Sequence, residues 1–260
     1  MPNSFAQYIG IDYSGAGSAE DSHKGISVWA ATRSSPPTEI RPNEPKGSYW
    51  SRRTLAAWLT NQLRESQVPI LVGIDHGFSF PIEYFQRYGL TTWRAFLEDF
   101  RKHWPLHEPQ RFVDEFRPEF GGKLTRGGAP TTLRLCEQWT SSAKSVFAFD
   151  GPGRVGKATH TGLPWLLQLK EDLGDKVHVW PFEGWKPREG AHVLSEVYPS
   201  LYHNRYPSPG LTGDQRDARA VALWMQDMAT RGELEAYFSP PLNAAERKQA
   251  DLEGWILGVR

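Results

Sequence analysis

The chain has 260 residues, enough for one large domain with a substantial core. Its 30 Lys and Arg residues balance 30 Asp and Glu residues, and this zero net charge argues against a protein that coats nucleic acid non-specifically. A single cysteine excludes an intramolecular disulfide, and no apolar stretch approaches the ~20 residues that cross a bilayer, so we expect a cytoplasmic protein.

Short apolar runs between turn signals predict a sheet in the first part of the chain. Residues 8–12 form a run that ends in Gly-Ile-Asp, and residues 25–31 alternate like a strand that pairs with it as a hairpin. A weaker strand is expected at 38–41 and an amphipathic helix at 51–65. Residues 69–75 repeat the opening pattern, again ending in Gly-Ile-Asp. This order predicts that the first and fourth strands lie adjacent and parallel.

The rest of the chain combines a predicted insertion with further strands and helices. Residues 83–145 contain an amphipathic helix near 93–104 and then charged, glycine-rich segments, which we interpret as a cap inserted into a single domain, 1–260. The patterns that follow predict five more elements: a strand at 145–150, a helix at 161–173, a strand at 176–182, an extended segment at 193–198 and a helix from about 213 to 229. We therefore expect an α/β fold.

Asp12 and Asp75 are the most distinctive pair of polar residues. Each ends an apolar strand, where an ionised carboxylate is costly unless it is paired or bound to a cation. If the two strands are neighbours at ~4.8 Å, the carboxylates converge on one spot. Such a pair holds either a shared proton or a divalent metal ion, Mg²⁺ or Mn²⁺. The alternative is that both residues only cap the loops that follow.

The helix at 213–229 supplies a third carboxylate. Asp214 and Asp217 fall on the same helix face as Val221, at the end where we expect the helix to dock on the sheet. Asp217 is favoured for the site, with Asp214 second, although acids in a first helical turn are also stabilised by the helix dipole alone. Glu196 is a candidate fourth ligand, but its alternating context also fits an ordinary half-exposed strand.

The segment 123–157 is rich in basic residues. It contains six Lys or Arg against two acids, a net charge of +4 that would steer phosphate groups toward the acidic centre. The candidates for phosphate contact are Lys123, Arg126, Arg154 and Lys157. Solvated surface charge is the alternative. Residues 151–158 nearly spell a phosphate-binding P-loop, but Ala158 stands where that motif needs Ser or Thr, and Gly162 and Pro164 argue against a helix directly after it.

Two histidines are weaker candidates for a ligand or a proton carrier. His76 directly follows Asp75, and His160 lies next to the basic segment. The sequence has no paired cysteines, no His-Glu-x-x-His and no Gly-x-Ser-x-Gly, so a structural zinc site and a serine hydrolase have no support.

Several short motifs occur in one order along nearly the whole chain, except in 83–145. They are Gly10-Ile11-Asp12, Gly73-Ile74-Asp75 with Pro81, Val155-Gly156 through Gly162-Leu163-Pro164, Glu196-Val197-Tyr198-Pro199, Asp217-Ala218 and Glu253-Gly254-Trp255-Ile256. Together they resemble an uncharacterised prokaryotic domain-of-unknown-function family regarded as predicted nucleases with an RNase H fold. The sequence departs from that pattern at His76-Gly77, where the family more often has a small residue and Pro.

The resemblance implies an RNase H-like mixed sheet, in which three antiparallel strands are followed by parallel strands with crossover helices. It also implies that the acidic positions are Asp12, Asp75, Glu196 and Asp217. The leading hypothesis is therefore a metal-dependent nuclease or phosphodiesterase, with one or two Mg²⁺ or Mn²⁺ ions bound by these four residues and a nucleic acid or nucleotide as substrate. Two alternatives remain: an actin-like or sugar-kinase-like ATP-dependent phosphotransferase, and a catalytically inactive RNase H-like binding protein.

Overall fold

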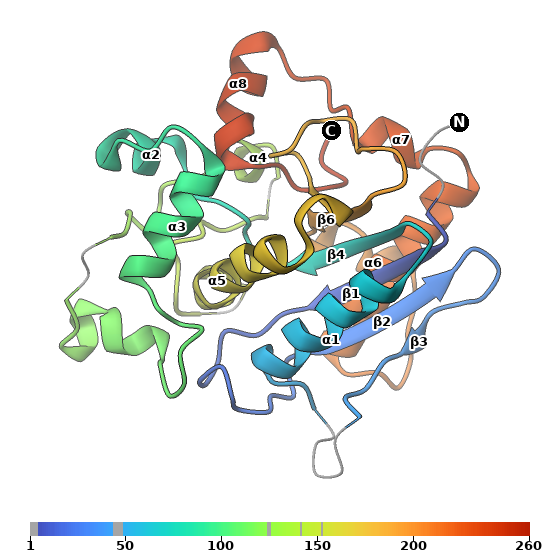
Figure 1. Ribbon diagram of the computed structural model, residues 1–260, viewed down its shortest axis with the longest axis horizontal. Helices are drawn as coiled ribbons and strands as arrows, with labels where there is room; N and C mark the ends of the chain where they lie inside the picture. The colour runs from blue at the N-terminus through green and yellow to red at the C-terminus, as the bar shows by residue number, and fades with distance from the viewer. Residues whose placement is uncertain (1–4, 44–48, 124–125, 141, 152) are drawn as a thin grey trace.

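The computed structural model describes residues 5–43, 49–123, 126–140, 142–151 and 153–260. These residues form an α/β fold around one six-stranded sheet, in the order β3-β2-β1-β4-β6-β5 (Figure 1). The strands are β1 (Gln7–Asp12), β2 (Ser27–Thr32), β3 (Thr38–Glu39), β4 (Ile70–Asp75), β5 (Val177–Val179) and β6 (His192–Glu196).

The sheet changes from antiparallel to parallel at β1. Strand β2 pairs antiparallel with both β1 and β3, whereas β1 with β4, β4 with β6 and β6 with β5 are parallel pairs. This arrangement confirms the predicted order of antiparallel and then parallel strands, and the predicted adjacency of β1 and β4. Because β1 and β4 are parallel, their carboxyl ends lie at the same edge of the sheet.

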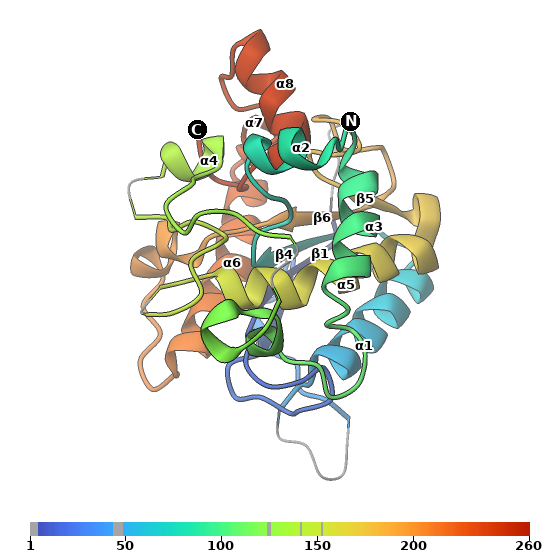
Figure 2. The same cartoon turned by 90° about the vertical axis from the view of Figure 1, so that its left-hand side faces the viewer.

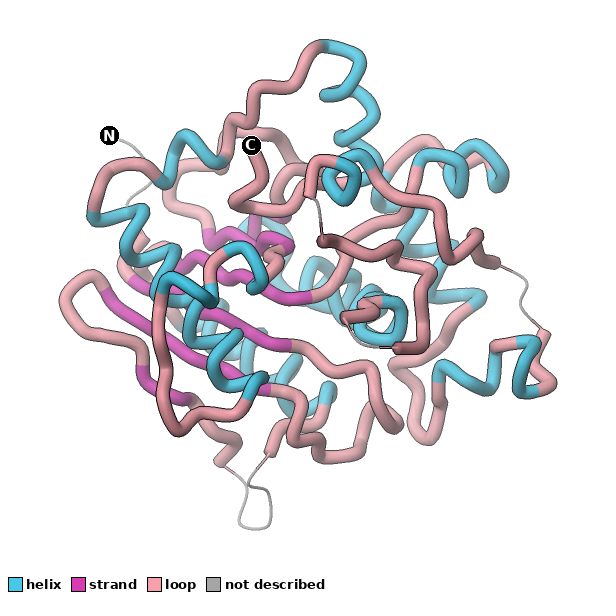
Figure 3. Tube along the Cα trace, turned by 180° about the vertical axis from the view of Figure 1, so that it is seen from behind, coloured by secondary structure: helices cyan, strands magenta, loops and turns pink. Residues whose placement is uncertain are grey.

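Helices cover both faces of the sheet (Figure 2). Successive side chains of a strand point to opposite faces of the sheet, so the sheet separates two parts of the core. Ile9 and Val72 pack on the face covered by α1 (Arg52–Glu65) and α5 (Gly156–Leu173). Tyr8 and Leu71 pack on the opposite face, which α6 covers. Helix α6 (Gly213–Thr230) crosses the other face, over β1 and β2, as the view from behind shows (Figure 3).

The remaining helices are shorter and lie around the sheet. They are α2 (Ile82–Tyr88), α3 (Trp93–His103), α4 (Leu135–Gln138), α7 (Leu234–Tyr237), α8 (Ala244–Glu253) and 3-10 turns at Val113–Phe116, Pro118–Phe120, Gly174–Lys176, Pro199–Leu201 and His203–Arg205. Within the segment 83–145, helix α3 packs on α5, and its Phe96 and Phe100 belong to the same core cluster as the strand residues of that face. In the described part of the chain, no helix is long and apolar enough to cross a membrane.

Three predicted elements differ from the structure. Residues 145–150 form a buried turn rather than a strand, because Ser145 accepts hydrogen bonds from the amides of Phe147 and Ala148. Helix α5 begins at residue 156 instead of 161, and Gly162 and Pro164 lie inside it. Strand β5 covers only three residues of the expected 176–182. Apolar composition marks these segments as buried, but it does not specify their backbone conformation.

Candidate acidic site at the sheet edge

Asp12 and Asp75 lie side by side at the carboxyl ends of β1 and β4. Their Cα atoms are direct partners in the parallel register, and the Asp75 carboxylate is among the causes that raise the pKa of Asp12. Protein surrounds both side chains on most sides, yet each keeps part of its surface open to solvent. The structure thus brings together the two residues on which the sequence prediction of a site mainly depends.

Two glycines determine how closely α6 approaches this pair. A Cβ atom on Gly10 would lie 2.1 Å from the carbonyl oxygen of Ala218, and one on Gly73 would lie 2.8 Å from Cγ1 of Val221. The helix backbone therefore rests directly on the sheet at Gly10, whereas at Gly73 the Val221 side chain of the helix fills the space above the strand. Since side chains two residues apart in a strand share a face, Asp12 and Asp75 point to the same side as the helix. The repeated Gly-Ile-Asp pattern has a physical explanation: the glycine admits the helix and the aspartate faces its first turn.

The amino-terminal part of α6 brings two more carboxylates, Asp214 and Asp217, near the pair. Asp217 Oδ1 accepts a hydrogen bond from His203 Nδ1 at 3.0 Å and one from Arg216 Nε at 3.3 Å. Asp214 acts on Asp12 electrostatically and makes no hydrogen bond or ion pair with the residues that the structure describes. The sequence prediction missed His203, because nothing in its local pattern links it to a residue 14 positions later.

The electrostatics of the pair reflect burial and an excess of negative charge. Burial, followed by the carboxylates of Asp75, Asp214 and Asp217, raises the pKa of Asp12 well above its ordinary value. Burial, with the carboxylates of Asp217 and Glu196, raises the pKa of Asp75 to about 7. The strongest charged neighbours of Asp12 are thus other acids. Such a pair holds one proton between its two members, or the site must take up positive charge.

Glu196 does not join the pair, although it ends the neighbouring strand β6. It lies opposite Ile74 in the register, one residue before Asp75, so its side chain leaves the other face of the sheet. There both of its carboxylate oxygens accept hydrogen bonds from Arg134, at 2.5 and 2.7 Å, and both side chains are buried. The structure therefore corrects the expectation that Glu196 converges with Asp12 and Asp75 on a single metal site.

Buried carboxylates on this second face hold loops at the carboxyl edge of the sheet. Glu196 also accepts a hydrogen bond from the amide of Phe78 at 2.9 Å. Glu253 accepts hydrogen bonds from the amides of Ile82 and Leu135, both at 2.6 Å. These contacts tie the loop after β4, the start of α4 and the end of α8 together. Their role is to position the loop that follows Asp75.

Two of the four basic residues predicted to contact phosphate already form ion pairs with aspartates of the protein. Arg126 forms two hydrogen bonds with Asp99, at 2.8 and 3.0 Å, and Lys157 Nζ lies 2.8 Å from an oxygen of Asp114. These cations therefore hold the protein together rather than face a substrate. Lys123 and Arg154 are exposed.

The P-loop-like segment does not offer an open phosphate cradle. Helix α5 does begin at Gly156, contrary to the expectation that no helix follows directly, but the amide of Gly156 donates to the carbonyl oxygen of Ala148 at 3.0 Å. The loop after β1 also covers this helix end, since a Cβ on Gly15 would lie 2.3 Å from the carbonyl oxygen of Lys157. Pro152 of this motif lies outside the described residues.

The two candidate histidines are buried on the α5 side of the sheet. His76 Nδ1 contacts the carbonyl oxygen of Gly77 at 2.9 Å, and its ring packs against Tyr13. His160 Nδ1 contacts the carbonyl oxygen of Gly156 at 2.8 Å within a group of aromatic rings. Burial lowers the pKa of His76 to about 4 and that of His160 to about 3. Both rings are therefore neutral packing residues in this structure.

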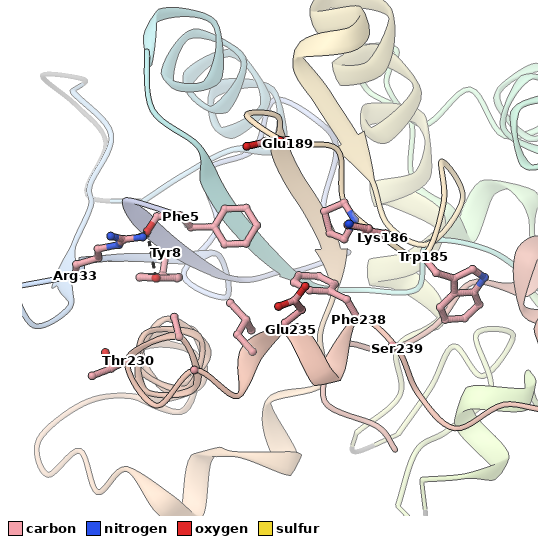
Figure 4. A pocket seen from close by; sticks show the side chains of 14 residues that line it. Phe5, Tyr8, Arg33, Trp185, Lys186, Glu189, Thr230, Glu235, Phe238 and Ser239 are labelled. Carbon is pink, nitrogen blue, oxygen red and sulfur yellow. Dashed lines mark hydrogen bonds between the residues drawn. The ribbon is translucent and has the colours of Figure 1, made fainter. Parts of the chain in front are cut away.

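A large cavity in the described part of the molecule is remote from the acidic pair. It has a volume of about 1060 Å³ and lies at the amino-terminal end of β1, between Phe5, Trp185 and Phe238 (Figure 4). Charged residues of both signs, among them Lys186 and Glu235, also line it. Asp12 and Asp75 lie at the opposite edge of the sheet, at the carboxyl ends of β1 and β4. The volume of a cavity alone therefore does not identify the candidate active site.

The donor atoms near Asp12 and Asp75 determine which kind of metal ion could bind there. In the described ranges, no group of three or more His, Cys, Asp or Glu side chains is already placed to hold a metal ion. The donors near Asp12 and Asp75 are nevertheless carboxylate oxygens with an excess of negative charge, the kind that Mg²⁺ and Mn²⁺ prefer. The residues fit a hard divalent cation by their chemistry. No family model matches the chain, and no curated protein or solved structure was found to match it.

Proposed function

We propose that the protein is a metal-dependent phosphodiesterase or nuclease with an RNase H-like domain. The observation that supports this most strongly is the shared edge position of Asp12 and Asp75, whose carboxyl groups repel one another and face solvent in part. An acidic pair at the carboxyl edge of parallel strands, where the sheet changes its pairing, is a typical place for an active site in an α/β fold. The fold alone does not determine the activity.

The sheet order supports the RNase H-like part of the proposal. Strands β3-β2-β1-β4-β6 give three antiparallel strands followed by parallel ones, as the resemblance implies. Strand β5 forms the edge of the sheet, and β6, which follows it in the chain, lies between β5 and β4. The buried free thiol of Cys136 suits a reducing compartment, and we infer a cytoplasmic location from it.

Within the site, the residues have distinct proposed roles. Asp12 and Asp75 would hold Mg²⁺ or Mn²⁺ from the strands, and Asp214 would complete the set from α6. A bound cation of this kind supplies Lewis acidity toward a phosphoryl oxygen and a water molecule. Asp217 would orient His203, whose Nδ1 it already binds. The positive end of the α6 dipole stabilises the carboxylates that face its first turn.

Calorimetric titration of Mn²⁺ into the protein tests this proposal. Wild type should bind Mn²⁺, and Asp12→Asn and Asp75→Asn should each abolish binding. Asp175→Asn is the matched control, because Asp175 is exposed and lies two residues before the start of β5, at the opposite edge of the sheet. A wild-type protein that binds Mn²⁺ should then be tested on DNA, RNA and hybrid substrates. Equal binding by all four proteins, or none by any, would refute the metal site.

A further inference from the structure

Ser27 is a buried polar residue beside the acidic pair whose hydroxyl is not accounted for. It begins β2, and its Cα lies opposite that of Asp12 in the antiparallel register. Only 4% of its surface is exposed, and Oγ has no hydrogen-bond partner among the described residues. Buried polar atoms almost always have a partner. Because this hydroxyl lies in the row of the acidic pair, it is placed to contact a ligand bound there.

The Ser27 side chain lies on the same face as the Asp12 carboxylate. Directly opposed residues of paired strands point to the same side of a sheet. Trp29, two residues further along β2, belongs to the core cluster that packs under α6. Ser27, Asp12 and Asp75 therefore form one row across β2, β1 and β4, at the edge where α6 begins.

We propose that Ser27 Oγ is a further oxygen ligand of the divalent cation bound by Asp12 and Asp75, an inference that rests on the function proposed above. A hydroxyl oxygen is a hard donor like a carboxylate oxygen, so it suits Mg²⁺ and Mn²⁺. It carries no charge, and it therefore adds a ligand without adding to the repulsion among the acids. Ser27 would also bring a third strand into the site.

Replacing Ser27 by cysteine and comparing Cd²⁺ with Mn²⁺ tests whether residue 27 binds the metal ion or only lies near it. In Ser27→Cys a thiolate would replace the hydroxyl, and thiolates favour Cd²⁺ over Mn²⁺. The affinity ratio of Cd²⁺ to Mn²⁺, measured by calorimetry, should rise by about tenfold or more relative to wild type. The ¹¹³Cd NMR resonance should move downfield to a position that reports a sulfur ligand. The native Cys136 is present in every protein compared, so it does not contribute to the difference.

Ser195→Cys is the matched control. Ser195 is also fully buried and lies on the same face, opposite Gly73, but its hydroxyl already donates to the carbonyl oxygen of Val72 at 3.2 Å. This variant should leave the metal preference and the ¹¹³Cd resonance unchanged. Ser27→Ala, which adds no bulk, should weaken Mn²⁺ binding while the melting temperature stays close to that of wild type.

The outcomes separate this inference from the proposed function. If wild type binds Mn²⁺ through Asp12 but Ser27→Cys shows the wild-type metal preference and no sulfur signal, Ser27 is not a ligand and the acidic site remains. If Ser27→Cys does not fold, unchanged Mn²⁺ affinity in Ser27→Ala overturns the inference. If wild type binds neither Mn²⁺ nor Cd²⁺, both the inference and the proposed function are wrong.

Discussion

Glu196 and Asp75 end neighbouring strands of the sheet, but their side chains leave it on opposite faces. Glu196 is aligned with Ile74, one residue before Asp75. This difference of one residue directs the Glu196 carboxylate to the buried Arg134 and the Asp75 carboxylate to the candidate site. The two acids therefore respond differently to substitution, and stability and metal binding can be measured separately.

Glu196→Gln should destabilise the protein without removing the metal site. Neutralising Glu196 removes one of the two buried carboxylates that bind Arg134 and weakens its two hydrogen bonds with this arginine, at a cost of about 1.5–3 kcal/mol in the free energy of unfolding, while Glu137 still balances the Arg134 charge. Urea denaturation measures this loss, and calorimetry should show nearly wild-type Mn²⁺ affinity. Lost Mn²⁺ binding in Glu196→Gln at unchanged stability would contradict the assignment of Glu196 to the opposite face.

Asp75→Asn should change how stability depends on pH when divalent cations are removed by a chelator. The unfolded chain releases the Asp75 proton near the ordinary pKa of about 4, whereas the folded protein keeps it up to about 7, so wild type loses stability as pH rises through this range. The variant should therefore be more stable than wild type at pH 8 by about 1–3 kcal/mol, and similar to it at pH 4. A constant difference across this range, measured by urea denaturation, would argue against a shared proton.

His160→Phe should protect the protein against acid. An unfolded histidine takes up a proton near pH 6.5, but burial keeps His160 neutral until about pH 3, so wild type loses stability as pH falls through this interval. The phenylalanine has no such proton to bind. Relative to wild type, the variant should gain about 2–3 kcal/mol between pH 7 and pH 4. Thermal melts over this range measure the gain, and parallel curves for the two proteins would show that His160 is protonated in the folded state.

Gly10→Ala should displace α6 and thereby damage the acidic site. The new methyl group would collide with the backbone of α6, and the loss of stability is expected to be about 3 kcal/mol. Gly213→Ala is the matched control, because a Cβ there meets no atom within 4 Å at the start of the same helix. It should be neutral or slightly stabilising. Denaturation and Mn²⁺ titration of both variants check this, and a fully stable Gly10→Ala would show that the helix does not rest on the sheet as described.

The sequence predicts the centre of the candidate site better than its periphery. Asp12 and Asp75 could be predicted because each follows an apolar run with the same Gly-Ile pattern, and because a crossover connection makes their strands neighbours. Asp214 and Asp217 could be placed near them because helical periodicity is a local property.

The face on which Glu196 lies could not be predicted in the same way. It depends on the register between β4 and β6, and its partner Arg134 is 62 residues earlier in the chain. The pairing of Arg126 with Asp99 could not be predicted either. A count of charged residues in a segment does not show which of these charges are paired in the folded protein. The turn at 145–150 was predicted as a strand because apolar side chains fill a core in either backbone conformation.

The contact between Gly10 and α6 also has a consequence for biosynthesis. β1 ends at Asp12 and is made well before the helix that rests on it, which begins at Gly213 and ends at Thr230. The chain must therefore be translated through Thr230 before the acidic site can close, and β1, β2 and β4 wait until then with one apolar face uncovered. A ribosome that stops before α6 would release a product with both strand aspartates but no helix above them. The order of translation thus limits full assembly of the site to chains that already contain α6.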